Sequence, residues 1–65
     1  MDGTYTVFNH FTGRLIMTHA TSSMVRSFME MQAALYNYGS YRYKDEDGTR
    51  YYDVGTVVYR VEKNF

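Results

Sequence analysis

Polar and apolar residues alternate along two segments near the N-terminus, a pattern typical of half-buried strands. Residues 4–8 and 14–19 are rich in β-branched and aromatic residues, and the loop between them, residues 9–13, ends in a glycine. These features predict a β-hairpin. The alternation also admits a register shifted by one residue. With Phe8 opposite Arg14, one face of this hairpin would carry Tyr5, Val7, Leu15 and Met17.

In the middle of the chain, apolar residues recur with the longer period of a helix. Three candidate N-cap residues at 21–23 precede this segment, which predicts a helix that begins near Ser22. Gly39 is expected to end the helix. Because steps of four and three residues place side chains on one helical face, the apolar stripe is predicted to pack on a sheet. The stripe consists of Met24, Phe28, Met31, Leu35 and Tyr38.

A second hairpin is predicted around Asp47 and Gly48, a pair favoured in two-residue type I′ turns. This turn sets Asp45 opposite Arg50 and sorts the flanking side chains onto two faces. One face would be mainly aromatic and carry Tyr41, Tyr43, Asp45, Arg50, Tyr52 and Val54. The other would be mainly charged and carry Arg42, Lys44, Glu46, Thr49, Tyr51 and Asp53.

The last strand-like segment, residues 56–62, is separated from the preceding one only by Gly55. We therefore expect one long strand over residues 49–62, bent by a bulge at Gly55, whose second half pairs with the first hairpin. The predicted fold class is α+β: a single domain over residues 1–65, with a four-stranded, mainly antiparallel sheet. One helix packs on one face of this sheet, in the order ββαββ.

Composition limits the classes of function. With 45% hydrophobic and 22% charged residues, a chain of 65 residues is expected to fold, and to be too small for a second domain. Seven basic and seven acidic residues cancel, which weakens the case for nucleic acid or an anionic membrane as partner. Neither a membrane-spanning run nor a signal peptide is recognisable, so we expect a cytoplasmic protein.

Catalytic and metal-binding patterns are not found in the sequence. There is no cysteine, and the two histidines, His10 and His19, would lie at opposite ends of the first hairpin, about 15 Å apart. Around Gly48, the spacing of an EF-hand loop would place Val54 where the bidentate glutamate belongs. The expectation is therefore a protein that is not an enzyme and needs no cofactor or metal.

Binding surfaces are the remaining source of function. Tyrosine, methionine and arginine are enriched at protein interfaces. The outward, charged face of the second hairpin offers Arg42, Lys44 and Tyr51 as partner contacts. Met29 and Tyr36 are predicted at the margin of the buried helical stripe, where they would either complete the core or contact a partner or a second copy.

The sequence thus favours a small protein-binding module whose partner is another protein. A chain this short that starts with methionine is typical of the proteins that phages and mobile elements encode to bind and inhibit a host protein, here in the host cytoplasm. A homodimer through a sheet edge or the helix flank fits the same features. The alternative is a single-stranded nucleic-acid-binding protein that uses Arg42, Lys44, Tyr51 and Arg60, which the balanced charge disfavours.

Overall fold

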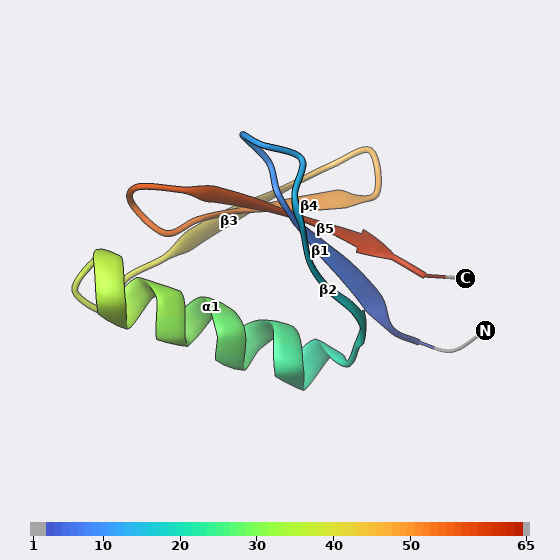
Figure 1. The fold of residues 1–65 in the computed structure, drawn as a ribbon, viewed down its shortest axis with the longest axis horizontal. Helices are drawn as coiled ribbons and strands as arrows, with labels where there is room; N and C mark the ends of the chain where they lie inside the picture. The colour runs from blue at the N-terminus through green and yellow to red at the C-terminus, as the bar shows by residue number, and fades with distance from the viewer. Residues whose placement is uncertain (1–2, 65) are drawn as a thin grey trace.

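The computed structural model describes residues 3–64 and contains one layer of sheet and one helix (Figure 1). All neighbouring strands are antiparallel, in the spatial order β2-β1-β5-β4-β3. The helix lies along one face of the sheet. No helix among the described residues is long and apolar enough to cross a membrane. The elements are β1 (Tyr5–Asn9), β2 (Leu15–Ala20), α1 (Ser22–Tyr36), β3 (Arg42–Glu46), β4 (Thr49–Asp53) and β5 (Val58–Lys63).

The α+β class and the helix on an antiparallel sheet are confirmed, but the predicted four strands in the order ββαββ are wrong. The sheet has five strands, because the chain reverses between Asp53 and Val58 instead of continuing as one bent strand. Residues 54–57 form this reversal, in which the Val54 N–H donates to the Val57 carbonyl at 3.1 Å. Gly55, at φ 99°, approaches the helix end so closely that a Cβ would lie 2.9 Å from Asn37 Cγ.

The second hairpin matches its prediction. Glu46 pairs with Thr49, and Asp45 lies opposite Arg50. Asp47 and Gly48 both have positive φ angles, 53° and 81°, as a type I′ turn requires. The turn chemistry alone was sufficient to place these side chains on their two faces.

The first hairpin forms with a different register. Phe8 lies opposite Leu15, and not opposite Arg14, while Val7 lies opposite Met17. The pairing has two irregularities, and His19 adopts a positive φ of 55° close to one of them. Bulges of this kind insert an extra residue in one strand, which a strict alternation cannot predict.

The helix begins where predicted and ends earlier. Thr21 is the N-cap, and its side chain accepts a hydrogen bond from the Met24 N–H at 3.2 Å. The last helical residue is Tyr36, three residues before Gly39. The Gly39 N–H donates to the Ala33 carbonyl at 2.9 Å, so that the glycine closes the helix end one turn beyond the helix itself.

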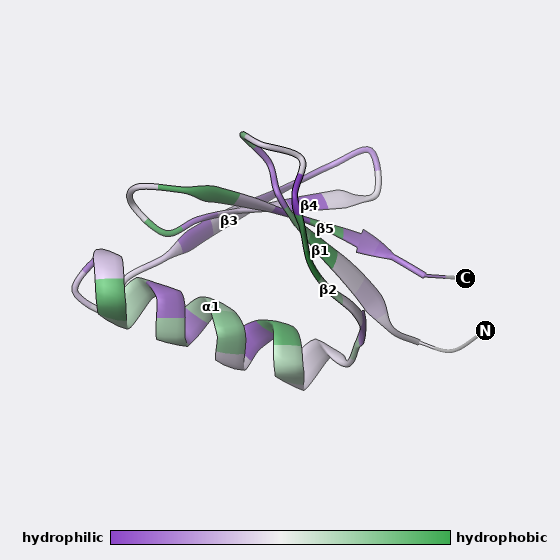
Figure 2. Ribbon diagram, viewed as in Figure 1, coloured by the Kyte–Doolittle hydropathy of each residue, from purple (hydrophilic) through white to green (hydrophobic). Residues whose placement is uncertain are grey.

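The helical face in the core is not the predicted stripe. Val25, Met29 and Ala33 are buried, whereas the stripe residues Met31 and Leu35 are 60% and 64% exposed. The sheet presents the bulky Tyr52 and Tyr59 to the helix, and smaller helical residues leave room for these rings. Figure 2 shows apolar segments, in green, along the length of α1. The sheet contributes Val7, Ala20, Tyr52, Tyr59 and Val61 to the core, and the β4–β5 turn contributes Val54.

Candidate functional site: the open face of the sheet

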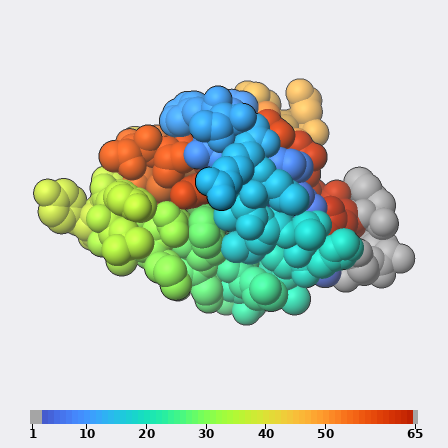
Figure 3. Space-filling view, in the orientation of Figure 1, coloured from blue at the N-terminus to red at the C-terminus, as the bar shows by residue number. Residues whose placement is uncertain are grey.

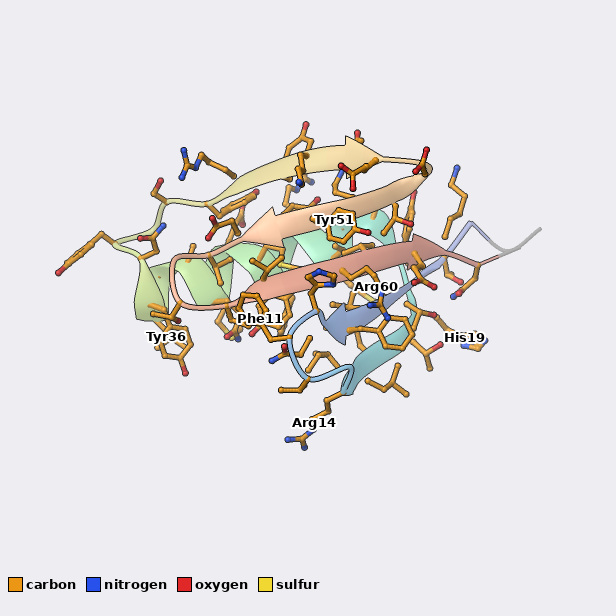
Figure 4. The ribbon with its side chains drawn as sticks, turned by 90° about the horizontal axis from the view of Figure 1, so that it is seen from above. Phe11, Arg14, His19, Tyr36, Tyr51 and Arg60 are labelled. Carbon is orange, nitrogen blue, oxygen red and sulfur yellow. The ribbon has the colours of Figure 1, made fainter. Side chains whose placement is uncertain are left out.

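The sheet face opposite α1 has no covering element among residues 3–64. Figure 4 looks onto this face, with Tyr51 and Arg60 in front and the helix behind the sheet. The β1–β2 loop and the β3–β4 turn both rise on this side, away from α1, as the ribbon and the space-filling view show (Figures 1 and 3). We call this surface the open face.

One row of side chains crosses four strands of the open face. Phe8 of β1 lies opposite Arg60 of β5, which lies opposite Tyr51 of β4, which in turn lies opposite Lys44 of β3. Aromatic and cationic residues therefore alternate along the row. The Arg60 guanidinium carbon lies 4.6 Å from the Phe8 ring centre, and Lys44 Nζ lies 5.9 Å from the Tyr51 ring centre. We call these four residues the central row.

Acidic side chains neighbour the cations of the central row. Arg60 Nε lies 2.9 Å from a carboxylate oxygen of Glu62, and Lys44 Nζ lies 3.8 Å from a carboxylate oxygen of Glu46. Both pairs are on the protein surface, where such pairs contribute little to stability. The open face is consequently a mosaic of both charge signs around aromatic rings.

A shallow hollow lies beside the central row, between the β1–β2 loop and the second hairpin. Its volume is about 510 Å³, and its lining includes His10, Arg42, Lys44, Tyr51 and Val58. The His10 ring packs edge-on against Tyr51 with 5.0 Å between ring centres. The hollow opens to solvent and presents polar, charged and aromatic groups together, an arrangement suited to holding side chains of a partner.

The structure brings most of the predicted binding residues together. Arg42, Lys44, Tyr51 and Arg60 all lie on the open face. The expectation for Met29 is wrong, because this side chain is completely buried between helix and sheet.

Tyr36 is 54% exposed, but it belongs to the last turn of α1, in the layer behind the sheet in Figure 4. Its part in partner binding stays a prediction.

Phe8 and His10 are site residues that sequence reasoning missed. The predicted first hairpin already placed Phe8 on the face opposite Val7, but nothing in the sequence paired β1 with the same strand that pairs with β4. Only the pairing of β5 with both β1 and β4 brings Phe8 into one row with Tyr51. His10 lies at the site because its backbone N–H donates to the Val58 carbonyl at 2.8 Å.

The best-defined ion pair of the second hairpin lies on its other face, the one that α1 partly covers. Two nitrogens of Arg50 donate to the Asp45 carboxylate at 2.6 and 3.0 Å. These hydrogen bonds lower the pKa of Asp45, and the same pair raises the pKa of Arg50. Arg50 also stacks on Tyr43, 4.0 Å from its ring centre. This cluster lies on the face opposite the central row and leaves the cations of the open face to other contacts.

Burial also raises the pKa of one tyrosine in the core. Tyr59 donates its hydroxyl to Gln32 Oε1 at 3.2 Å beneath the helix, and its pKa is raised by desolvation. Within residues 3–64, no three histidine, aspartate or glutamate side chains lie close enough to hold a metal ion. The open face offers groups for stacking, charge pairing and hydrogen bonding.

The fold and this surface define a small α+β protein with an exposed aromatic and charged sheet face. Comparison with protein-family models, with curated proteins and with solved structures finds no match for the chain.

Proposed function

We propose that this protein is a non-enzymatic binding module whose open face contacts a partner protein. The central row is the observation that carries the proposal. It places two aromatic rings and an arginine side by side in the middle of an uncovered sheet face. Aromatic and arginine side chains supply most of the binding energy at protein interfaces, above all near the interface centre.

The charges of the open face favour a protein over a nucleic acid. Each of its three cations has an acidic neighbour: Arg60 and Lys44 form the surface pairs described above, and Arg42 lies opposite Asp53 in the register. A phosphate backbone would meet the carboxylates as well as the cations. A protein surface with interleaved charges can complement both signs, which favours one orientation of the partner.

A module of this kind acts by occupying a surface of its partner. An inhibitor of a cytoplasmic host protein, encoded by a phage or a mobile element, is the particular form of this function that we propose. It requires no catalytic group, and only a face whose contacts outlast those of the partner's natural ligand.

The test is a double variant on the open face, Arg42→Glu with Tyr51→Ala. We expect capture of the partner from a lysate, followed by mass spectrometry, to fall more than about tenfold, because an anchor ring is lost and a charge is reversed. The thermal midpoint should stay within a few degrees, since neither residue belongs to the core.

The matched control reverses the charge of an arginine and truncates a tyrosine away from the open face, Arg26→Glu with Tyr38→Ala. Both residues are exposed, Arg26 on α1 behind the sheet and Tyr38 just after the helix, so capture should equal that of the wild type. Equal capture by both double variants would place the binding surface elsewhere.

Single-stranded nucleic acid is the second candidate, because Phe8, Arg60 and Tyr51 lie side by side on adjacent strands, where bases could stack on the rings. It predicts a mobility shift with single-stranded oligonucleotides that weakens steeply between about 50 and about 200 mM salt. No shift at the lower salt concentration would exclude it.

A further inference from the structure

The edge of the sheet at β3 presents backbone hydrogen-bonding groups to solvent. β3 is the last strand of the sheet, and among residues 3–64 no element lies beside it. In a hairpin with a two-residue turn, the pair next to the turn, here Glu46 and Thr49, exchanges two hydrogen bonds, and every second pair beyond it does the same. The N–H and C=O groups of Tyr43 and Asp45 lie between these pairs and therefore point away from β4.

Of the two edges of the sheet, the one at β3 is the more regular. The pairing of β3 with β4 has no irregularity, and every residue of β3 is exposed. The pairing of the other edge strand, β2, with β1 has two irregularities. Bulges bend and twist an edge strand and so hinder the addition of a further strand. The geometry therefore favours strand addition at β3.

The charges along β3 restrict which strand can be added. Charged residues on an edge strand, lysine above all, oppose pairing with apolar strands. The Asp45 carboxylate already accepts two hydrogen bonds from Arg50 on the α1 side of the sheet. On the open face, Arg42 forms no ion pair with any of residues 3–64, and Lys44 forms the 3.8 Å pair with Glu46. The charge that β3 leaves unpaired is thus positive.

Each side chain of β3 has two lateral neighbour positions, one on β4 and one on the solvent side. Asp53 occupies the β4 position beside Arg42, and its carboxylate accepts the Gly55 N–H at 2.9 Å. On the solvent side of Arg42 and Lys44, no strand formed by residues 3–64 supplies a neighbour. Opposite charges in cross-strand pairs are stabilising and like charges are destabilising. The two open positions therefore suit carboxylates.

We propose that β3 pairs with an extended segment of the partner protein that carries carboxylates at two alternate positions, so that this segment becomes a sixth strand. In an antiparallel arrangement, the residues opposite Arg42 and Lys44 belong to non-hydrogen-bonded pairs, whose side chains approach most closely. An apolar residue between the two carboxylates lies beside Tyr43. The inference deepens the proposed function and rests on it, because it names the part of the partner that the open face meets at its edge.

Titration of the isotope-labelled protein with a capped peptide, Lys-Thr-Glu-Val-Glu, tests the strand addition by NMR. In the antiparallel register its two glutamates lie beside Lys44 and Arg42, and its lysine lies beside Glu46. We expect a dissociation constant of roughly 1 mM, because a free peptide loses conformational entropy when it becomes a strand. Hydrogen exchange of the Tyr43 and Asp45 amides should slow, since these amides then donate to the peptide. The charge-reversed peptide, Glu-Thr-Lys-Val-Lys, should bind about tenfold more weakly.

Tyr43→Pro removes one outward N–H of the edge and keeps the bonds between β3 and β4, because proline is tolerated where the N–H faces solvent. It should weaken binding of the peptide by about tenfold. Tyr43→Ala is the matched control, since it removes the same side chain and keeps the N–H, and its affinity should stay within about threefold of the wild type. Circular dichroism checks that both variants fold. The exchange measurement uses the wild type and decides the question even if the proline variant unfolds.

Peptide binding without slower exchange of the Tyr43 and Asp45 amides would overturn the proposal. So would equal binding of the two peptides, or no binding at about 10 mM peptide. Capture from a lysate separates this proposal from the proposed function. If Tyr43→Pro captures the partner as Tyr43→Ala does, while the double variant Arg42→Glu with Tyr51→Ala does not capture it, then the open face binds the partner and the edge does not.

Discussion

Tyr38 adopts a backbone conformation that tyrosine rarely occupies. Its φ angle is 55°, in the left-handed region, and its side chain is fully exposed. Residues other than glycine are strained there because Cβ approaches the neighbouring carbonyl oxygen. The position lies between the helix end at Tyr36 and Gly39, whose N–H closes the helix.

We therefore predict that Tyr38→Gly raises the free energy of unfolding by about 0.5 to 1 kcal/mol, because relief of strain exceeds the entropy that glycine adds to the unfolded chain. Urea unfolding measures the change. Ala34→Gly is the matched control: Ala34 is exposed and lies inside α1, where glycine should lower stability by about 1 kcal/mol. A loss of stability for Tyr38→Gly would contradict the strain.

At the scale of elements, the two hairpins differ in how much local chemistry fixes them. Asp47 and Gly48 fix the register of the second hairpin, since few other residue pairs adopt two consecutive positive φ angles. The first hairpin has a longer loop and two irregularities, and its register depends on pairing with β5 as well as with β2. Local turn chemistry was therefore sufficient for the second hairpin, whereas alternation of residues was insufficient for the first.

The helix is another element whose packing the local sequence did not fix. It contains two apolar faces, and the face that carries Met24, Met31 and Leu35 is the exposed one. The pattern could identify a helix that begins near Ser22, but not the side of the helix that meets the sheet. That choice depends on the tyrosines of the sheet that lie opposite α1. These tyrosines are distant from α1 in the sequence.

Two neighbouring methionines test which helical face is in the core. Met29→Ala should lower the free energy of unfolding by about 2 to 4 kcal/mol, because Met29 is fully buried and its loss leaves a cavity. Met31→Ala should change it by less than about 0.5 kcal/mol, since Met31 is 60% exposed. Urea unfolding at low protein concentration measures both. A larger effect at Met31 would mean that the sheet packs on the face of α1 that carries Met31.

At the scale of the whole molecule, β5 joins the two hairpins. It is last in the chain but central in the sheet, with β1 on one side and β4 on the other. Each hairpin alone would be marginally stable, and the shared strand makes them one cooperative unit. The same strand supplies Arg60 to the central row, so the open face exists only when the sheet is complete.

Native-state hydrogen exchange tests this arrangement. Amides that bond within the central strands β1, β5 and β4 should exchange slowest and share one opening free energy, because they are freed only by global unfolding. Outward-facing amides of the edge strand β3 should exchange much faster, since β3 is exposed throughout. Equal protection of β3 and β5 in the monomer would contradict the strand order.

The sequence by itself determined the class of fold, the beginning of the helix and the complete register of the second hairpin, since a turn or a cap is specified by residues adjacent in the chain. It also determined that Arg42, Lys44 and Tyr51 share a face. The tertiary structure decided the fifth strand, the buried side of α1 and the joining of Phe8 to the central row. These features arise from contacts between distant segments, whose free energy depends on how bulky side chains fit together and not on any local pattern.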